Sequence, residues 1–237
     1  ADAYDDIIFL EGNGIIFRGN GDVELYAHNG SVTSVDRGKI PNIWTQGGDI
    51  IIQASSGIDM GSIQAGSENT TGPSEVPGEI RLTTTDGGDI NLQHLNVEGT
   101  RYGSVYVNSS GDLNIMGEKR LGGAVKVKTN TASVGFAARS FVCLIAEGDV
   151  NIQGDVYAEA HGDLLSRASI WIGAGTHIED PVNGYNGTVT VNGVIQADST
   201  ASGALKSDAT VRAYGSNVIF KSPGGHKAVQ ATAQSKT

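Results

Sequence analysis

The stretch Gly148-Asp149-Val150-Asn151-Ile152 decides the fold class of this 237-residue chain. Its apolar residues stand two positions apart, so Val150 and Ile152 share one face of a β-strand while Asn151 takes the other. A Gly-Asp pair precedes the alternation, and such a pair is typical of a tight turn. The stretch therefore predicts a half-buried strand that the chain enters from a turn.

The same arrangement recurs along the chain. Further copies read GDVEL at 21–25, GDIII at 48–52, GDINL at 88–92 and GDLNI at 111–115, with looser copies GEIRL at 78–82 and GTVTV at 187–191. Several continue into a second short strand, as in SIQA at 62–65, QHLNV at 93–97, QGDVYA at 153–158 and NGVIQA at 192–197. A unit of strand, bend, strand and glycine turn is one rung of a solenoid.

The Gly-Asp pair has an expected conformation and an expected spacing. We expect each glycine to supply a backbone with positive φ, and each aspartate to hydrogen-bond neighbouring amides of its own turn. The successive pairs start 27, 40, 23 and 37 residues apart. Some of these intervals fit one rung, and others fit one long rung or two short rungs. This irregularity predicts loops inserted on one side, with residues 67–77 and 179–186 as the candidates.

Repetition in one orientation predicts an all-β fold, a single-stranded right-handed parallel β-helix of about 8 to 11 rungs. The alternative is an antiparallel β-sandwich or jelly roll, whose strands also alternate. We expect a single solenoid domain over residues 1–237, with an N-terminal strand within 1–12 and a C-terminal tail or strand from about 222 to 237. The side chains expected to point inward and stack in columns are Ile50, Ile52, Ile90, Leu92, Leu113, Ile115, Val150 and Ile152.

Charge and composition exclude several classes of function. The chain has 16 Lys and Arg against 26 Asp and Glu, a net charge of −10, which opposes nucleic-acid binding. No apolar run approaches the roughly 18 to 20 residues of a membrane-spanning helix, so we expect no membrane insertion. The one cysteine, Cys143, lies in an apolar run and is expected to be a small buried side chain. The start at Ala1 without an apolar leader fits an exported chain whose signal peptide has been removed.

The repeats bear a family resemblance. GDIIIQA at 48–54 and GDVNIQG at 148–154 resemble the repeat units of filamentous-haemagglutinin-type bacterial surface adhesins and related extracellular β-helix proteins. NGIIF at 13–17 is similar to part of the Asn-Pro-Asn-Gly-Ile segment near the start of their secretion domains. The resemblance implies a right-handed β-helix, export to the cell surface or medium, and a role in surface contact or in building a matrix or biofilm.

Parallel β-helices are also the scaffold of polysaccharide lyases and hydrolases, so a carbohydrate-active enzyme or glycan-binding module is the alternative function. The side chains to examine for catalysis are His161, Asp163, Arg167, Glu179 and Asp180. No set of carboxylates with a basic residue recurs at equivalent positions of the repeats, so we expect a chain that is not an enzyme. Five scattered histidines and one cysteine offer no ligand spacing, and we expect neither a metal nor another cofactor.

Two sets of side chains are candidates for binding. Exposed aromatic rings often hold sugars or protein partners, and the candidates are Trp44, Tyr102, Tyr106, Trp171 and Tyr185. Trp171 stands between Ile170 and Ile172, so it points either outward as a binding residue or inward, and an isolated tryptophan favours the core. A β-helix exposes unpaired backbone groups at both ends, and the sequence predicts neither a capping helix nor a charged loop that would cover them. The expected partners are therefore other copies of the chain, or a cell-surface glycan or matrix, with self-association through Ile7, Ile8, Phe9, Leu10, Val229 and Ala231.

Overall fold

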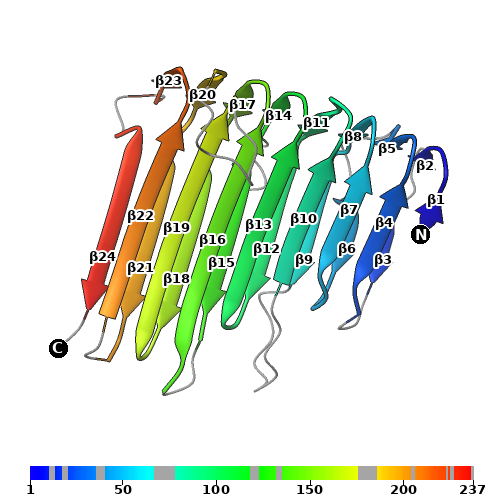
Figure 1. The fold of residues 1–237 in the computed structure, drawn as a ribbon. Coiled ribbons are helices and arrows are strands. Elements are labelled where there is room, and N and C mark those ends of the chain that lie inside the picture. Colours follow the sequence, from blue (N-terminus) through cyan, green and yellow to red (C-terminus); the bar gives the residue numbers. More distant parts are fainter. Residues whose placement is uncertain are drawn as a thin grey trace.

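A computed structural model shows a parallel β-helix (Figure 1). It describes residues 1–10, 14–17, 21–35, 41–66, 78–117, 123–131, 135–175, 186–203, 206–222, 224 and 227–235. Three sheets of eight strands run side by side, and every third strand along the chain returns to the same sheet. The strand pairs are parallel, which rules out the antiparallel sandwich. The described residues contain no helix, and so none that is long and apolar enough to cross a membrane.

Each turn of the chain, one rung, adds one strand to each sheet, giving eight rungs. The first sheet consists of β1 (Asp2–Ala3), β4 (Val23–Ala27), β7 (Ile50–Ala54), β10 (Gly78–Thr84), β13 (Tyr102–Ser109), β16 (Ala137–Ala146), β19 (Leu165–Ala174) and β22 (Lys206–Tyr214). The second sheet consists of β2 (Ile7–Phe9), β5 (Ser31–Ser34), β8 (Gly57–Asp59), β11 (Asp89–Leu92), β14 (Leu113–Ile115), β17 (Val150–Gln153), β20 (Thr188–Asn192) and β23 (Asn217–Phe220). The third sheet consists of β3 (Ile15–Phe17), β6 (Pro41–Thr45), β9 (Ser62–Gly66), β12 (His94–Gly99), β15 (Val125–Asn130), β18 (Val156–Gly162), β21 (Ile195–Ala201) and β24 (Val229–Ser235).

The core is a set of aliphatic columns inside the three sheets. In the second sheet Leu92, Ile115, Ile152 and Val191 occupy equivalent positions on successive rungs. All eight side chains predicted to point inward are at most 2% exposed, so that prediction is confirmed. Alternation works because one face of each strand lines the core and the other faces outward.

The Gly-Asp pairs mark two different corners of the solenoid. Asp22 and Asp49 stand just before strands of the first sheet, whereas Asp89, Asp112 and Asp149 stand at the start of strands of the second sheet. The step of 40 residues between the second and third pairs is therefore one rung plus one strand. The unequal spacing thus has two causes, the change of corner and the variable rung length.

The aspartates bind the next rung, contrary to the expectation that they hold their own turn. The Oδ1 atom of Asp89 accepts a hydrogen bond from the backbone N–H of Asp112 at 2.7 Å, and that of Asp112 accepts one from Asp149 at 2.8 Å. Asp149 accepts the N–H of Thr188 at 2.7 Å in the same way. Each carboxylate therefore fastens one rung to the following rung.

The expected role of the glycines was also wrong. None of the glycines of the five pairs has positive φ. They are needed for space: a β-carbon on Gly111 would lie 2.3 Å from Oδ1 of Asp89. At Gly30 it would lie 2.5 Å from Oδ1 of Asp6. A side chain stands at the equivalent position of the last rung, at Ser216 above Thr188. At Gly111 and Gly148 the glycine thus makes room for the carboxylate of the preceding rung, whereas a β-carbon on Gly48 or Gly88 would meet the backbone of the preceding rung.

An asparagine ladder covers the outer face of the second sheet. The side-chain amide of Asn114 donates to Oδ1 of Asn91 at 3.0 Å, and that of Asn151 donates to Oδ1 of Asn114 at 3.2 Å. Stacked amides satisfy one another because equivalent residues recur one strand apart.

The two chain ends are built from strands. Residues 1–10 hold two strands, β1 and β2, and the predicted C-terminal tail or strand contains β24. Of the loop candidates, 67–77 lies outside the described residues, as does 179–186 except for Asn186.

Candidate functional site

Three of the aromatic candidates lie on the outer face of the first sheet. Tyr102 and Tyr106 are on β13 and Trp171 is on β19. Ile170 and Ile172 are fully buried while Trp171 is 39% exposed, so Trp171 points outward. The expectation that favoured the core for this tryptophan was wrong, because both faces of β19 carry large apolar groups and alternation alone does not say which face is inside.

The rings form a row across adjacent strands. Phe141 on β16 lies between the other two rings, with centroids 5.2 Å from Tyr106 and 5.3 Å from Trp171. The Tyr106 and Phe141 rings are tilted by 52°, and the Phe141 and Trp171 rings meet edge to face at 80°. Such offset and edge contacts are the favoured arrangements of aromatic pairs. We call Tyr106, Phe141 and Trp171 the aromatic row.

Arginines flank the aromatic row. The guanidinium carbon of Arg81 lies 5.4 Å from the centre of the Tyr106 ring, and that of Arg212 lies 5.3 Å from the centre of Trp171. Arg139 stands 5.8 Å from the centre of the Tyr102 ring. A cation over a ring face is attracted by the ring quadrupole, which holds these long side chains against the sheet.

Cys143 lies under the aromatic row and is 2% exposed, as predicted for a small buried side chain. It stands in register between Tyr106 and Trp171, on the outer face of the sheet rather than in the central core. Burial raises the pKa of this thiol to about 11. The thiol therefore stays protonated at neutral pH and is a poor nucleophile.

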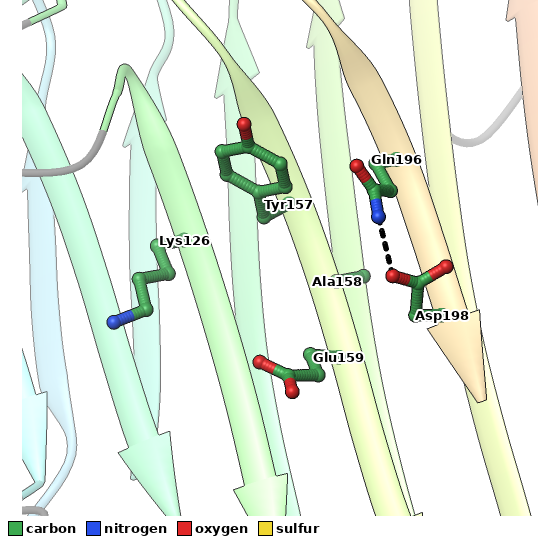
Figure 2. A pocket seen from close by; sticks show the side chains of 6 residues that line it. All are labelled: Lys126, Tyr157, Ala158, Glu159, Gln196 and Asp198. Atoms are coloured by element: carbon green, nitrogen blue, oxygen red, sulfur yellow. Dashed lines mark hydrogen bonds between the residues drawn. The ribbon is translucent and has the colours of Figure 1, made fainter. Parts of the chain in front are cut away.

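A second feature is a depression of about 310 Å³ on the outer face of the third sheet (Figure 2). The residues that line it come from β15, β18 and β21, and are Lys126, Tyr157, Ala158, Glu159, Gln196 and Asp198. Figure 2 shows the amide of Gln196 directed at the carboxylate of Asp198, to which it donates a hydrogen bond.

The charged groups of this depression are already paired with protein groups. Nε2 of His161 lies 2.5 Å from Oε1 of Glu159, and Nζ of Lys128 lies 3.8 Å from its other oxygen. Nζ of Lys126 lies 3.4 Å from Oε1 of Glu98. Burial would raise the pKa of Glu159, but the His161 hydrogen bond and the Lys128 charge outweigh it and lower the pKa below its ordinary value. Glu159 is consequently a carboxylate at neutral pH and a poor general acid.

The residues considered for catalysis are engaged with different partners. His161 is bonded to Glu159 on the third sheet, and Arg167 on the first sheet contacts Oδ2 of Asp208 at 3.2 Å. Asp163, in the turn between these sheets, accepts the N–H of Gly135 at 2.7 Å. Glu179 and Asp180 lie outside the described residues. The three described residues therefore do not converge on one substrate position.

The remaining candidates are spread over the molecule. Trp44 is on β6 of the third sheet, in register with Gln64, and Tyr185 lies outside the described residues. In the terminal strands, Ile7 and Val229 continue the inward columns because they pair in register with buried Val32 and Ile195. The inward columns also include Phe9 and Ala231, whereas Ile8 and Leu10 are 56% and 63% exposed.

No family model, curated protein or solved structure matches this chain. The described residues also hold no group of three or more His, Cys, Asp or Glu side chains placed to bind a metal ion.

Sequence reasoning missed the residues that complete the aromatic row. Phe141 opens the apolar run FVCLIA at 141–146, whose length predicts a strand but does not by itself single out Phe141. That run is apolar on both faces, and this signals a strand whose outer face is also covered. Arg139 and Arg212 gave no signal, because their aromatic partners lie 37 and 41 residues earlier in the chain.

Proposed function

We propose that this chain is an exported, non-enzymatic structural element that assembles head to tail with other copies of itself into a filament. The observation that carries the proposal is the state of the two terminal rungs. Strands β1, β2 and β3 have a neighbour on one side only, and so do β22, β23 and β24. An open strand edge is a template for pairing with another strand. Export is supported by the resemblance of the repeats to those of surface adhesins.

The apolar interior is uncovered where these edges are free. On the last rung the inward-facing Val218 and Val229 are 39% and 38% exposed, and Val211 and Phe220 are only partly buried. Equivalent positions in the middle of the rod are fully buried, as at Val189 and Val191. A further rung laid on this end would remove the apolar surface from water, at roughly 25 cal/mol per Å².

The two ends carry opposite charge. Residues 1–10 contain three carboxylates, Asp2, Asp5 and Asp6, and no Lys or Arg. Residues 206–235 contain four cations, Lys206, Arg212, Lys221 and Lys227, against the single carboxylate of Asp208. Complementary charge favours an N-terminal rung meeting a C-terminal rung, and like charge opposes the contact of two identical ends. This contact uses two different surfaces, so it propagates as an open chain rather than closing as a dimer.

The test is a pair of charge-reversal variants. Asp2→Lys/Asp5→Lys makes both ends of one variant positive, and Lys221→Glu/Lys227→Glu makes both ends of the other negative, because two cations then stand against three carboxylates in residues 206–235. We expect the native protein to form rods in electron micrographs at low ionic strength, and each variant alone to remain monomeric in sedimentation. Mixing the two variants should restore rods, because every contact between unlike variants then joins opposite charges.

A matched control reverses charge on the side of the rod, with Lys126→Glu/Lys128→Glu on β15, and should leave assembly unchanged. The proposal is wrong if the native protein remains a monomer at high concentration and low salt. It is also wrong if the variants assemble alone as well as the native protein does.

A further inference from the structure

We infer that the outer face of the first sheet binds a linear acidic polysaccharide, one that carries carboxylate or sulfate groups on some of its sugar units. This inference does not depend on assembly of the chain, since it concerns the side of the rod rather than its ends. It rests on the charge of the face, on two arginines without acidic partners, and on the aromatic row beside them.

The face is positively charged on an acidic protein. Strands β10, β13, β16, β19 and β22 contain five cations, Arg81, Arg139, Arg167, Lys206 and Arg212, and two carboxylates, Glu79 and Asp208. The chain as a whole has a net charge of −10. The corresponding third-sheet strands β12, β15, β18, β21 and β24 contain two Lys or Arg and three carboxylates. An anionic ligand would therefore be drawn to the first sheet rather than to the rest of the rod.

Among the residues that the structure describes, two of these arginines have no carboxylate partner. Arg81 contacts Oε1 of Glu79 at 2.7 Å, and Arg167 contacts Asp208 at 3.2 Å. Within the described part of the chain Arg139 and Arg212 form no ion pair, and both are exposed. Their guanidinium groups are held by the rings of Tyr102 and Trp171 instead. A guanidinium that rests on a ring keeps N–H donors for a carboxylate or sulfate, which it binds through two parallel hydrogen bonds.

The aromatic side chains supply the apolar part of the contact. Trp171 and Tyr102 are 39% and 47% exposed, and Tyr106 and Phe141 are half-buried. Sugar rings present apolar C–H surfaces, and such surfaces pack on exposed aromatic side chains. Tyr106, Phe141, Trp171 and Arg212 lie on the successive strands β13, β16, β19 and β22, and Arg139 lies beside this line, two residues from Phe141 on β16. A ligand that meets the aromatic row and Arg212 therefore extends along the axis of the solenoid, as a chain molecule does.

The charge pattern favours a polysaccharide over a nucleic acid. Each nucleotide adds a phosphate, so a strand laid along this face would meet Glu79 and Asp208 as well as the arginines. The overall charge of −10 would also repel a polymer of that charge density at long range. A polysaccharide with anionic groups on only some of its units matches two free arginines better.

The experiment is affinity electrophoresis, with the dissociation constant measured by titration calorimetry. The probes are hyaluronate and κ-carrageenan, which carry one carboxylate or one sulfate per two sugar units, neutral dextran, and an oligothymidylate. We expect retardation by at least one of the acidic polysaccharides, none by dextran, and weaker binding of the oligonucleotide. Arg139→Gln and Arg212→Gln should each weaken binding roughly tenfold, which is the loss expected for one charge-assisted contact. Trp171→Ala should weaken it as well.

The matched control is Lys126→Gln/Lys128→Gln on the third sheet, which changes the net charge by as much as the double variant Arg139→Gln/Arg212→Gln. It should bind like the native protein, and Arg139→Lys should bind between native and Arg139→Gln because it keeps the charge but loses the paired donors. Circular dichroism and sedimentation must show that each variant keeps its fold and assembly state. The inference is overturned if neither acidic polysaccharide binds, if the lysine control loses as much affinity as the arginine variants, or if the oligonucleotide binds more tightly.

Discussion

The carboxylate of Asp112 occupies the space next to Gly148 of the following rung, where a β-carbon would lie 2.1 Å from Oδ1. The same oxygen accepts the N–H of Asp149 at 2.8 Å, so the carboxylate is held in that space. The Gly148-Asp149 pair thus contacts both neighbouring rungs. Gly148 packs against the carboxylate of Asp112 in the rung below, and the carboxylate of Asp149 accepts the N–H of Thr188 in the rung above.

Gly148→Ala should destabilise the protein by about 1–3 kcal/mol, because the methyl group displaces a fixed carboxylate. In an Asp112→Ser background the same substitution should cost much less, as the arrangement of Ser56 above Ser31 illustrates. Urea unfolding of the four proteins of this double-mutant cycle measures the coupling. Ser56→Ala is the control and should be nearly neutral. Equal cost of Gly148→Ala in both backgrounds would contradict the contact.

Ile152→Asp should unfold the neighbouring rungs, since this side chain is fully buried between Ile115 and Val191. An unpaired buried charge costs several kcal/mol. Asn151→Asp introduces the same carboxylate one residue away on the outer face, and should cost only about 1 kcal/mol through the lost amide contact. Thermal melts followed by circular dichroism compare the two variants. A native melting temperature for Ile152→Asp would contradict the inward orientation of Ile152 on β17.

The thiol of Cys143 should react slowly with an aromatic disulfide reagent at pH 8 and at once in guanidinium chloride. Burial keeps its pKa near 11 and the aromatic row covers it. Trp171→Ala should speed the reaction of the folded protein by uncovering the sulfur. If the native thiol reacts as fast as the unfolded one, the aromatic row does not close over β16 as described.

Asp49→Asn should raise stability slightly at neutral pH. Burial raises the pKa of Asp49 from its ordinary value of 3.8, and the neighbouring carboxylates of Asp22 and Glu79 raise it further. The folded state then binds the proton more tightly than the unfolded state, so this carboxyl loses stability as pH rises from 3.8 through the folded pKa. Asparagine keeps the acceptor oxygen for the N–H of Glu79 and does not titrate.

The gain for Asp49→Asn should be less than about 1 kcal/mol, since Asp49 is partly exposed and solvent screens its charge. Urea unfolding between pH 3 and 7 measures it: the two proteins should converge at the acid end and separate above it. A stability difference that shrinks as pH rises would show the opposite sign of pKa shift.

Removal of divalent cations with a chelator should leave the melting temperature unchanged. The Asp89, Asp112 and Asp149 carboxylates are satisfied by backbone N–H groups of the following rung rather than by a metal. A fall of several degrees on chelation would show that a cation binds where these carboxylates stack.

Period-two alternation was sufficient to predict the strands that follow the Gly-Asp pairs and their inward side chains, but the predicted unit of two strands is one strand short of the three that form each rung. Alternation works for Ile90 and Leu92 because burial on one face and exposure on the other is a property of a single strand. The same rule could not orient Trp171, because the outer face of its strand is covered by Phe141 and Arg212 from neighbouring rungs.

Contacts between rungs were not predictable from spacing, since the number of residues per rung varies. Asp22 contacts a residue 27 positions later, whereas Asp149 contacts one 39 positions later. Rung length depends on the loops, so neither the partner of Arg139 nor the use of Gly148 could be read along the chain. The turn chemistry of the Gly-Asp pair predicts a glycine with positive φ. The pair needs glycine for a different reason, because the neighbouring rung leaves no space for a β-carbon.

The contact between Asp112 and Gly148 restricts how such a chain can lengthen by duplication. A Gly-Asp rung copied next to another Gly-Asp rung satisfies both of its neighbours, because each copy brings the space for the rung below and the carboxylate for the rung above. A rung that begins with serine, such as that of Ser56, cannot be inserted above an aspartate without steric overlap. Gly-Asp rungs are therefore interchangeable with one another but not with rungs that begin with serine. The order of rungs along the rod is constrained by steric fit as well as by hydrophobicity.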